Sequence, residues 1–168
     1  MDKERYRPAI FIVVYARVKD KIEFLVLKRH LHWDGWEFPK GGVDRGEGKI
    51  ISAFREIKEE TGLNVVGKVQ KFNVSGKYKY DKQYPERRGF VGQTFSLFAA
   101  EVKKPFLRGI RVDKKEHSDY KWLEFPDALK KLTWSNQRRC LSVVEEWLKE
   151  KERDTQRAQE PDKSGKKK

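Results

Sequence analysis

The stretch GGVDRGEGKIISAFREIKEETGL, residues 41–63, decides the fold of this chain. It predicts a glycine-rich loop that leads into a helix over residues 49–61, which Gly62 ends. Successive residues on an α-helix turn by about 100°, so side chains three and four positions apart share one face. Three carboxylates share such a face, those of Glu56, Glu59 and Glu60. An apolar face suited to packing on a sheet consists of Ile50, Ala53, Phe54 and Ile57.

The three carboxylates predict a site for a divalent cation. Like charges on one helix face repel one another, and a hard cation such as Mg²⁺ removes that repulsion by binding carboxylate oxygens. A lone Glu-x-x-Glu-Glu is typical of a solvated acidic face. Here the preceding loop also carries Glu47, which Arg55 is expected to clamp in a bidentate ion pair that fixes the loop against the helix.

The whole run resembles the Nudix box, whose pattern is Gly, five residues, Glu, seven residues, then Arg-Glu-apolar-any-Glu-Glu-any-Gly-apolar. Every position is matched by Gly41, Glu47 and the segment 55–63. The resemblance implies an α/β (α+β) fold, namely a Nudix-type α/β/α sandwich with a central mixed sheet. It also implies hydrolysis of a nucleoside diphosphate linked to another group.

The same resemblance implies roles for individual residues. The metal ligands would be the backbone carbonyl of Gly41 and the carboxylates of Glu56, Glu59 and Glu60, with Mg²⁺ as the cofactor and Mn²⁺ as its substitute. Arg55 and Glu47 would belong to the catalytic machinery. A carboxylate takes the proton of the attacking water, and Glu56, Glu59 and Glu116 all stay open for that role.

Two further runs resemble the asymmetric dinucleoside tetraphosphate hydrolases. Residues 116–123, EHSDYKWL, are similar to their Glu-His-x-x-Tyr-x-Trp run, which would place Glu116 on a loop over the metals and leave His117 as a structural hydrogen-bonder. Residues 36–41, WEFPKG, are similar to their Trp-x-x-Pro-Lys-Gly entry, which implies that Lys40 reaches the phosphate chain. Gly35 and Gly42 depart from the pattern, because animal members often carry His there.

Residues 77–89, KYKYDKQYPERRG, predict a basic loop rich in tyrosine between two strands. Tyrosine rings can stack on a nucleobase, and arginine can grip distant phosphates. The predicted substrate-binding residues of this loop are Tyr80, Tyr84, Arg87 and Arg88.

Several functions compete. Hydrolysis of a dinucleoside tetraphosphate to ATP and AMP is favoured by Lys40 and the run after Glu116. An RNA 5′-pyrophosphohydrolase is the alternative, because its bacterial members also enter the box with Trp-x-x-Pro-x-Gly-Gly and carry a Gly-Gln like Gly92-Gln93. A (d)NTP pyrophosphatase comes third. A non-catalytic nucleotide- or RNA-binding module is disfavoured, since it has no need of three repelling glutamates.

Composition sets the remaining bounds. The net charge is +13, and residues 149–168 hold eight basic and five acidic residues, so +10 belongs to the rest of the chain. That charge favours polyanionic partners, a nucleotide substrate and RNA among them, and is equally typical of a solubility adaptation. No apolar run is long enough for a membrane helix, and the single Cys140 cannot form an internal disulfide. We therefore expect a cytoplasmic protein without membrane contact; the sequence leaves its oligomeric state open.

The chain is expected to form one domain over residues 1–152, followed by a basic, disordered tail over residues 153–168. Apolar alternation predicts the strands 9–18, 22–27, 36–38, 65–80, 90–102 and 120–123. Two helices are expected after them, a short one that opens at Phe125 and a last one over residues 137–150.

Overall fold

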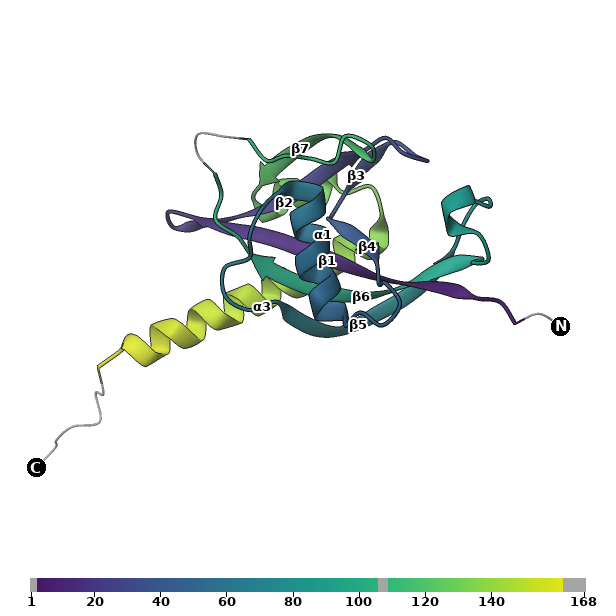
Figure 1. The fold of residues 1–168 in the computed structure, drawn as a ribbon. Helices are drawn as coiled ribbons and strands as arrows, with labels where there is room; N and C mark the ends of the chain where they lie inside the picture. Colours follow the sequence, from purple (N-terminus) through teal and green to yellow (C-terminus); the bar gives the residue numbers. More distant parts are fainter. Residues whose placement is uncertain (1–2, 106–108, 162–168) are drawn as a thin grey trace, which may run out of the picture.

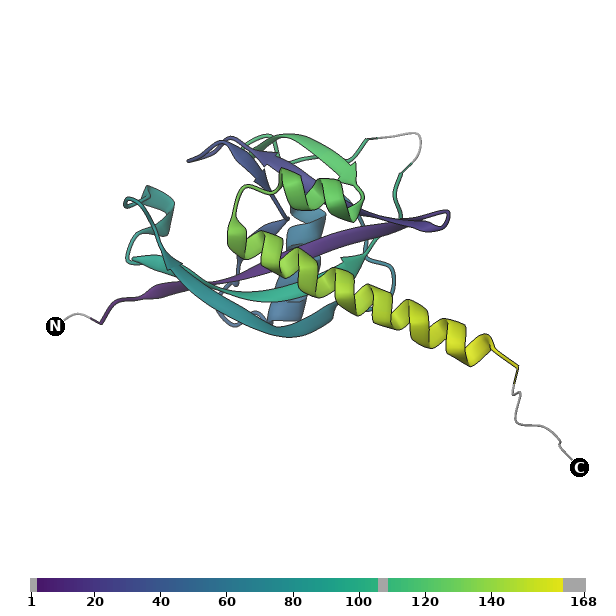
Figure 2. The same ribbon diagram turned by 180° about the vertical axis from the view of Figure 1, so that it is seen from behind.

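A computed structural model describes residues 3–105 and 109–161. Its strands are β1 (Tyr6–Val18), β2 (Lys21–Arg29), β3 (Gly35–Glu37), β4 (Lys40–Gly42), β5 (Gln70–Lys79), β6 (Gly92–Glu101) and β7 (His117–Leu123). Its helices are α1 (Lys49–Thr61), α2 (Phe125–Lys131) and α3 (Ser135–Gln159), with a short 3₁₀ turn at Pro85–Arg87. Figures 1 and 2 show the two sides of the fold.

The strands of the described residues form one mixed sheet in the order β3-β2-β1-β6-β5, with β4 also paired to β1 and β7 to β2. β1 runs parallel to β6, and the other pairings between named strands are antiparallel. Side chains on a strand alternate between its two faces, so β1 supplies both cores. Phe11, Val13 and Tyr15 belong to one buried cluster, and Ile10 and Ile12 to the other.

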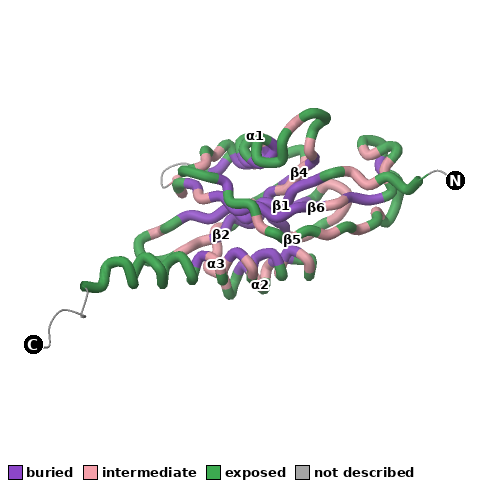
Figure 3. Tube along the Cα trace, turned by 90° about the horizontal axis from the view of Figure 1, so that it is seen from below, coloured by how far each residue is buried: buried purple, intermediate pink, exposed green. Residues whose placement is uncertain are grey.

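Helices cover both faces of the sheet, which confirms the predicted α/β/α sandwich. Ala53 and Ile57 of α1 pack into one cluster, while Leu141 and Val144 of α3 pack with Ala128 of α2 into the other. Figure 3 shows α1 on one side of the sheet and α2 and α3 on the other.

The bounds of α1 agree with the prediction, including Gly62, which adopts the left-handed conformation (φ 71°) and donates its N–H to Lys58 O at 2.9 Å. Half of the predicted apolar face of α1 is confirmed, because Ala53 and Ile57 are fully buried. The other half is wrong, since Phe54 is 40% and Ile50 46% exposed. The buried face also includes Glu56 and Glu60, which lie against the glycine backbone of β4.

The last helix extends beyond its predicted end near residue 150 and reaches Gln159. Residues 153–159 are therefore helical rather than disordered, and the predicted tail residues 162–168 lie outside the described part of the chain. Five of the seven residues 153–159 are Arg, Gln or Ala, which have high helix propensity, so this segment needs no apolar stripe. Arg153 also pairs with Glu146 at 3.2 Å. Figure 2 shows α3 running past the edge of the sheet.

Candidate active site

The strand β4 brings a bare backbone against α1. A Cβ atom built on Gly41 would lie 1.9 Å from Cδ of Glu56, so only glycine allows this approach. One residue earlier, the Lys40 N–H donates to Glu60 Oε2 at 3.2 Å. The backbone of β4 and the carboxylates of α1 therefore form one surface.

Arg55 joins the loop to the helix, as predicted. Its Nε lies 3.2 and 3.1 Å from the two oxygens of Glu47, and its Nη2 lies 3.1 Å from Glu47 Oε1. Nη2 also donates to Gly42 O at 3.0 Å. The remaining nitrogen, Nη1, contacts Glu56 at 2.8 Å and Glu59 at 3.2 Å. One guanidinium thus fixes the loop and orients two of the acids.

Burial gives the acids of α1 unusual proton affinity. It raises the pKa of Glu56 to about 7, against the attraction of Arg55 and with repulsion from Glu59 and Glu116 adding to it. Burial also raises the pKa of Glu60 well above its usual range, helped by neighbouring carboxylates. A divalent cation would return both groups to their ionised forms, so the cluster fits the expected cofactor.

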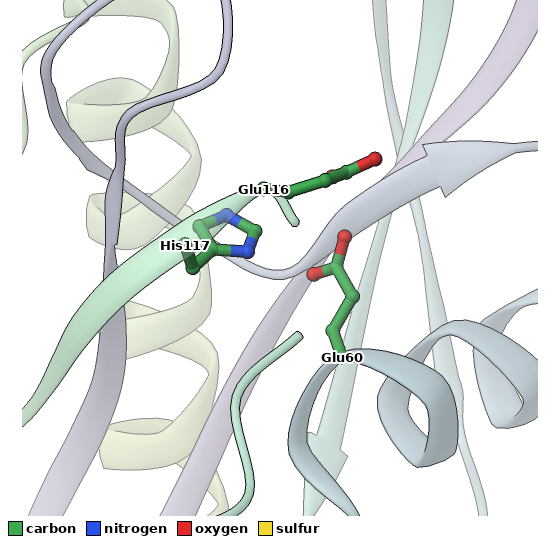
Figure 4. Close-up of side chains that lie close together, drawn as sticks. All are labelled: Glu60, Glu116 and His117. Carbon is green, nitrogen blue, oxygen red and sulfur yellow. The ribbon is translucent and has the colours of Figure 1, made fainter. Parts of the chain in front are cut away.

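The loop before β7 places Glu116 beside this surface. Ligand atoms of Glu60, Glu116 and His117 all lie within 4.8 Å of one another (Figure 4). Glu116 Oε2 also lies 3.4 Å from Arg29 Nη1. Glu116 therefore lies next to Glu60 of α1, in agreement with its predicted position.

Glu37 is the residue of this region that sequence reasoning missed. It is fully buried, and its Oε1 accepts from Arg29 Nη1 at 2.9 Å and contacts His117 Nε2 at 3.0 Å. Its Oε2 lies 2.8 Å from Lys40 Nζ. Burial opposes ionisation of Glu37, but Lys40, His117 and Arg29 outweigh it and lower the pKa to about 2. The available signal was a charged residue between the aromatic Trp36 and Phe38, at the end of β3.

Strand pairing explains how these residues meet. β2 lies between β3 and β7, with Leu27 opposite Glu37 and Arg29 opposite His117. Arg29 and Glu37 are both buried, and each has a partner of opposite charge. Such a network orients the groups at its margin, among them Glu116.

A cavity of about 420 Å³ opens next to this network. Four of the five predicted substrate-binding residues line it, namely Lys40, Tyr80, Tyr84 and Arg87. Arg88 is exposed and is not among the lining residues. The Arg87 guanidinium lies 4.8 Å from the ring centroid of Tyr80 and 5.5 Å from that of Tyr84, so it holds the two rings together.

The far wall of the cavity was not predicted. It comes from Trp33 in the loop after β2 and from Trp134 and Asn136 at the start of α3. The two indole rings meet edge to face with centroids 5.2 Å apart. Aromatic and cationic side chains thus line the same space, which suits a nucleotide.

The family model described as NUDIX domain matches residues 5–144. This chain is a Nudix hydrolase. It acts on nucleotide pyrophosphate bonds, and its family uses divalent metals.

Two curated relatives and one solved structure illustrate the likeness. An RNA pyrophosphohydrolase from Nitratiruptor sp. is 30% identical over 152 residues, which is 89% of this chain and 98% of that protein. The same enzyme from Sulfurovum sp. is 28% identical over 156 residues, 89% of this chain and 97% of that protein. The structure of a C. elegans Ap4A hydrolase binary complex has 25% identity and a TM-score of 0.66, and covers 84% of this chain and 97% of that one.

No helix within residues 3–105 and 109–161 of this Nudix hydrolase combines the length and the apolar character that a membrane crossing needs.

Proposed function

We propose that this Nudix hydrolase cleaves a dinucleoside tetraphosphate into ATP and AMP. The observation that carries the proposal is that residues lining the cavity also contact the carboxylates of Glu60 and Glu116. Lys40 and Arg29 line the cavity, while the Lys40 N–H binds Glu60 and the Arg29 guanidinium contacts Glu116. A nucleoside in the cavity would therefore have its phosphate chain led directly to the carboxylates.

The cofactor proposed for this site is Mg²⁺, with Mn²⁺ as its substitute. Its ligands would be the Gly41 carbonyl and the carboxylates of Glu56, Glu59 and Glu60, an all-oxygen set that hard cations prefer. When bound, the cation supplies charge neutralisation at the phosphates and makes bound water more acidic. Arg55 keeps Glu56 and Glu59 oriented while Glu47 holds Arg55.

The remaining chemistry belongs to side chains of the chain. A carboxylate accepts the proton of the attacking water, and Glu56, Glu59 and Glu116 are the three that the site offers. Lys40 and Arg87, which both line the cavity, would meet the phosphate chain. Tyr80 and Tyr84 would stack on a base.

RNA 5′-end hydrolysis is the second candidate function. It is favoured by the two curated relatives, which are named RNA pyrophosphohydrolase. Gln93, part of the Gly-Gln pair, accepts a hydrogen bond from the Tyr80 hydroxyl at 3.3 Å, so that pair adjoins the cavity. The basic body of the protein suits a polynucleotide as well.

Product analysis distinguishes these substrates. Diadenosine tetraphosphate, a short 5′-triphosphorylated RNA and the dNTPs are offered with Mg²⁺ at equal concentration. ATP and AMP from the dinucleotide, with the other substrates slow, is the expected result. Phosphate or pyrophosphate released mainly from RNA would replace the first function by the second, and preference for a dNTP would contradict both.

A further inference from the structure

His117 is a fully buried histidine with one ring nitrogen left over. It is the first residue of β7, and its side chain is inaccessible to solvent. Its Nε2 lies 3.0 Å from Glu37 Oε1. Its Nδ1 is buried and has no hydrogen-bond partner among the described residues. A buried polar atom without a partner lowers the stability of the folded state. A hydrogen-bond donor or a cation at Nδ1 would remove that cost.

The contact with Glu37 decides which nitrogen carries the proton. Glu37 is a carboxylate held ionised by Arg29 and Lys40, so it accepts the Nε2–H of His117. In this tautomer Nδ1 is the nitrogen that offers a lone pair to a ligand. A carboxylate that binds one ring nitrogen while the other ligates a metal is the usual support of metal-binding histidines.

The His117 ring belongs to a cluster with two carboxylates. The ligand atoms of His117, Glu60 and Glu116 lie within 4.8 Å of one another, and Figure 4 shows one nitrogen of the ring turned toward the Glu60 carboxylate. Since Nε2 is engaged by Glu37, Nδ1 is the nitrogen available to this cluster. Glu60 Oε2 accepts the Lys40 N–H, and Glu116 Oε2 faces Arg29, so each carboxylate has a second oxygen for a ligand.

We propose that His117 Nδ1 is a metal ligand and that, together with Glu60 and Glu116, it makes one cation site of this enzyme selective for Mn²⁺ over Mg²⁺. Imidazole suits transition metals, whereas Mg²⁺ prefers oxygen ligands alone. The other ligands proposed above, the Gly41 carbonyl and the carboxylates of Glu56 and Glu59, would offer oxygen atoms alone, while Glu60 would be shared between the two sets. This inference rests on the divalent-metal chemistry of the family and is independent of which nucleotide is cleaved.

Electron spin-echo spectroscopy of the full chain loaded with Mn²⁺ tests the proposal without a substrate. A histidine nitrogen bound to Mn²⁺ modulates the echo, and labelling histidine with ¹⁵N changes that modulation. The expected result is a histidine coupling in the wild-type protein. Absence of any histidine coupling in the Mn²⁺-loaded wild-type protein would overturn the proposal, in favour of a water molecule at Nδ1. Because no variant is needed, this readout does not depend on how a mutant folds.

The matched variants are His117→Gln and His30→Gln. A glutamine amide at 117 can still donate to Glu37 but has no counterpart of Nδ1, whereas His30 is exposed and bonds only Lys114 O. His117→Gln should lose the coupling and weaken Mn²⁺ binding about tenfold or more in titration calorimetry, with Mg²⁺ binding changed far less. His30→Gln should retain both. Persistence of the coupling in His117→Gln, or equal loss of Mn²⁺ and Mg²⁺ affinity, would overturn the assignment. Failure of dinucleotide hydrolysis with Mg²⁺ would leave this result untouched.

Discussion

At the scale of single residues, the site depends on contacts that allow few substitutes. Glu56 and Glu60 are buried against β4, whereas the side chain of Glu59 is 59% exposed. Arg55 reaches both Glu56 and Glu59 from one guanidinium nitrogen. Loss of a buried acid therefore changes packing and chemistry together, while loss of Glu59 changes chemistry alone.

Glu59→Gln is predicted to abolish metal-dependent turnover and leave the fold intact. The substitution removes a charge from the cation site at an exposed position, and loss of a group that positions or deprotonates water costs about 10²–10⁴-fold in rate. The measurement is kcat with Mg²⁺ alongside thermal unfolding. Glu146→Gln, on the opposite face of the sheet, is the control. Retained activity in Glu59→Gln would remove this residue from the site.

Gly41→Ala is predicted to destabilise the protein as well as inactivate it. The added Cβ would sit 1.9 Å from Glu56 Cδ, so the buried Glu56 carboxylate must shift from its place beside Arg55, and overpacking of this kind costs about 1–3 kcal/mol. Gly48→Ala is the matched control, because a Cβ there meets no atom within 4 Å. Denaturant unfolding of the two variants gives the comparison. Equal stability of both would contradict the close approach at Gly41.

Glu56 predicts how stability of the metal-free protein changes with pH. Its pKa is raised from 4.5 to about 7 in the folded state. The folded state therefore holds this proton more tightly than the unfolded chain, and its contribution is lost as pH rises from about 4.5 to about 7. In EDTA, the melting temperature should fall less steeply between pH 4.5 and pH 7 in Glu56→Gln than in the wild-type protein. Identical slopes would show that Glu56 is not the titrating group.

At the scale of elements, α1 and α3 play different parts. α1 turns an acidic face inward over β4, and its apolar Ile50, Ile51 and Phe54 face outward. α3 packs its first half through Cys140, Leu141, Val144 and Leu148. Residues beyond Leu148 are exposed through Pro161. The second half of α3 therefore adds charge to the molecule without adding to its core.

Deletion of residues 152–168 is predicted to leave turnover of small nucleotides unchanged. The deleted part of α3 is exposed and takes no part in lining the cavity. Steady-state kinetics with diadenosine tetraphosphate measures this, with the full chain as reference. A large loss of turnover would mean that the C-terminal residues reach the active site.

At the scale of the whole molecule, charge and topology act together. The mixed sheet brings α1 and the loop before β7 together, so that the cavity residues Lys40 and Arg29 contact Glu60 and Glu116. The body carries most of the net charge of +13, which strengthens attraction of any polyphosphate. The salt dependence of the binding constant therefore indicates how many phosphates the protein neutralises, which affinity at one salt concentration does not.

If RNA is a substrate, deletion of residues 152–168 should weaken its binding and reduce the dependence of log K on log salt concentration. Each phosphate that the shortened protein no longer neutralises lowers the slope by about 0.7 for a single strand. Fluorescence anisotropy of a labelled 5′-triphosphorylated RNA across a salt series measures the slope. An unchanged slope would show that this segment does not bind RNA.

Features that depend only on local spacing could be predicted from the amino-acid sequence. The bounds of α1, its end at Gly62 and the clamp of Glu47 by Arg55 follow from offsets within 23 residues, because the helical period places those side chains without help from the rest of the chain. The fold class follows from the same run through its resemblance to the Nudix box. The resemblance of residues 116–123 to the asymmetric dinucleoside tetraphosphate hydrolases likewise predicted that Glu116 lies near the acids of α1.

Contacts that depend on pairing between distant strands could be seen only in the tertiary structure. Glu37 and His117 are 80 residues apart, and they meet because β3 and β7 flank β2. The inward turn of Glu56 and Glu60, beside the apolar Ala53 and Ile57 that periodicity favoured, depends on the glycine backbone of β4 beneath them. Periodicity states which residues share a face, but which face is buried depends on what the rest of the chain places against it.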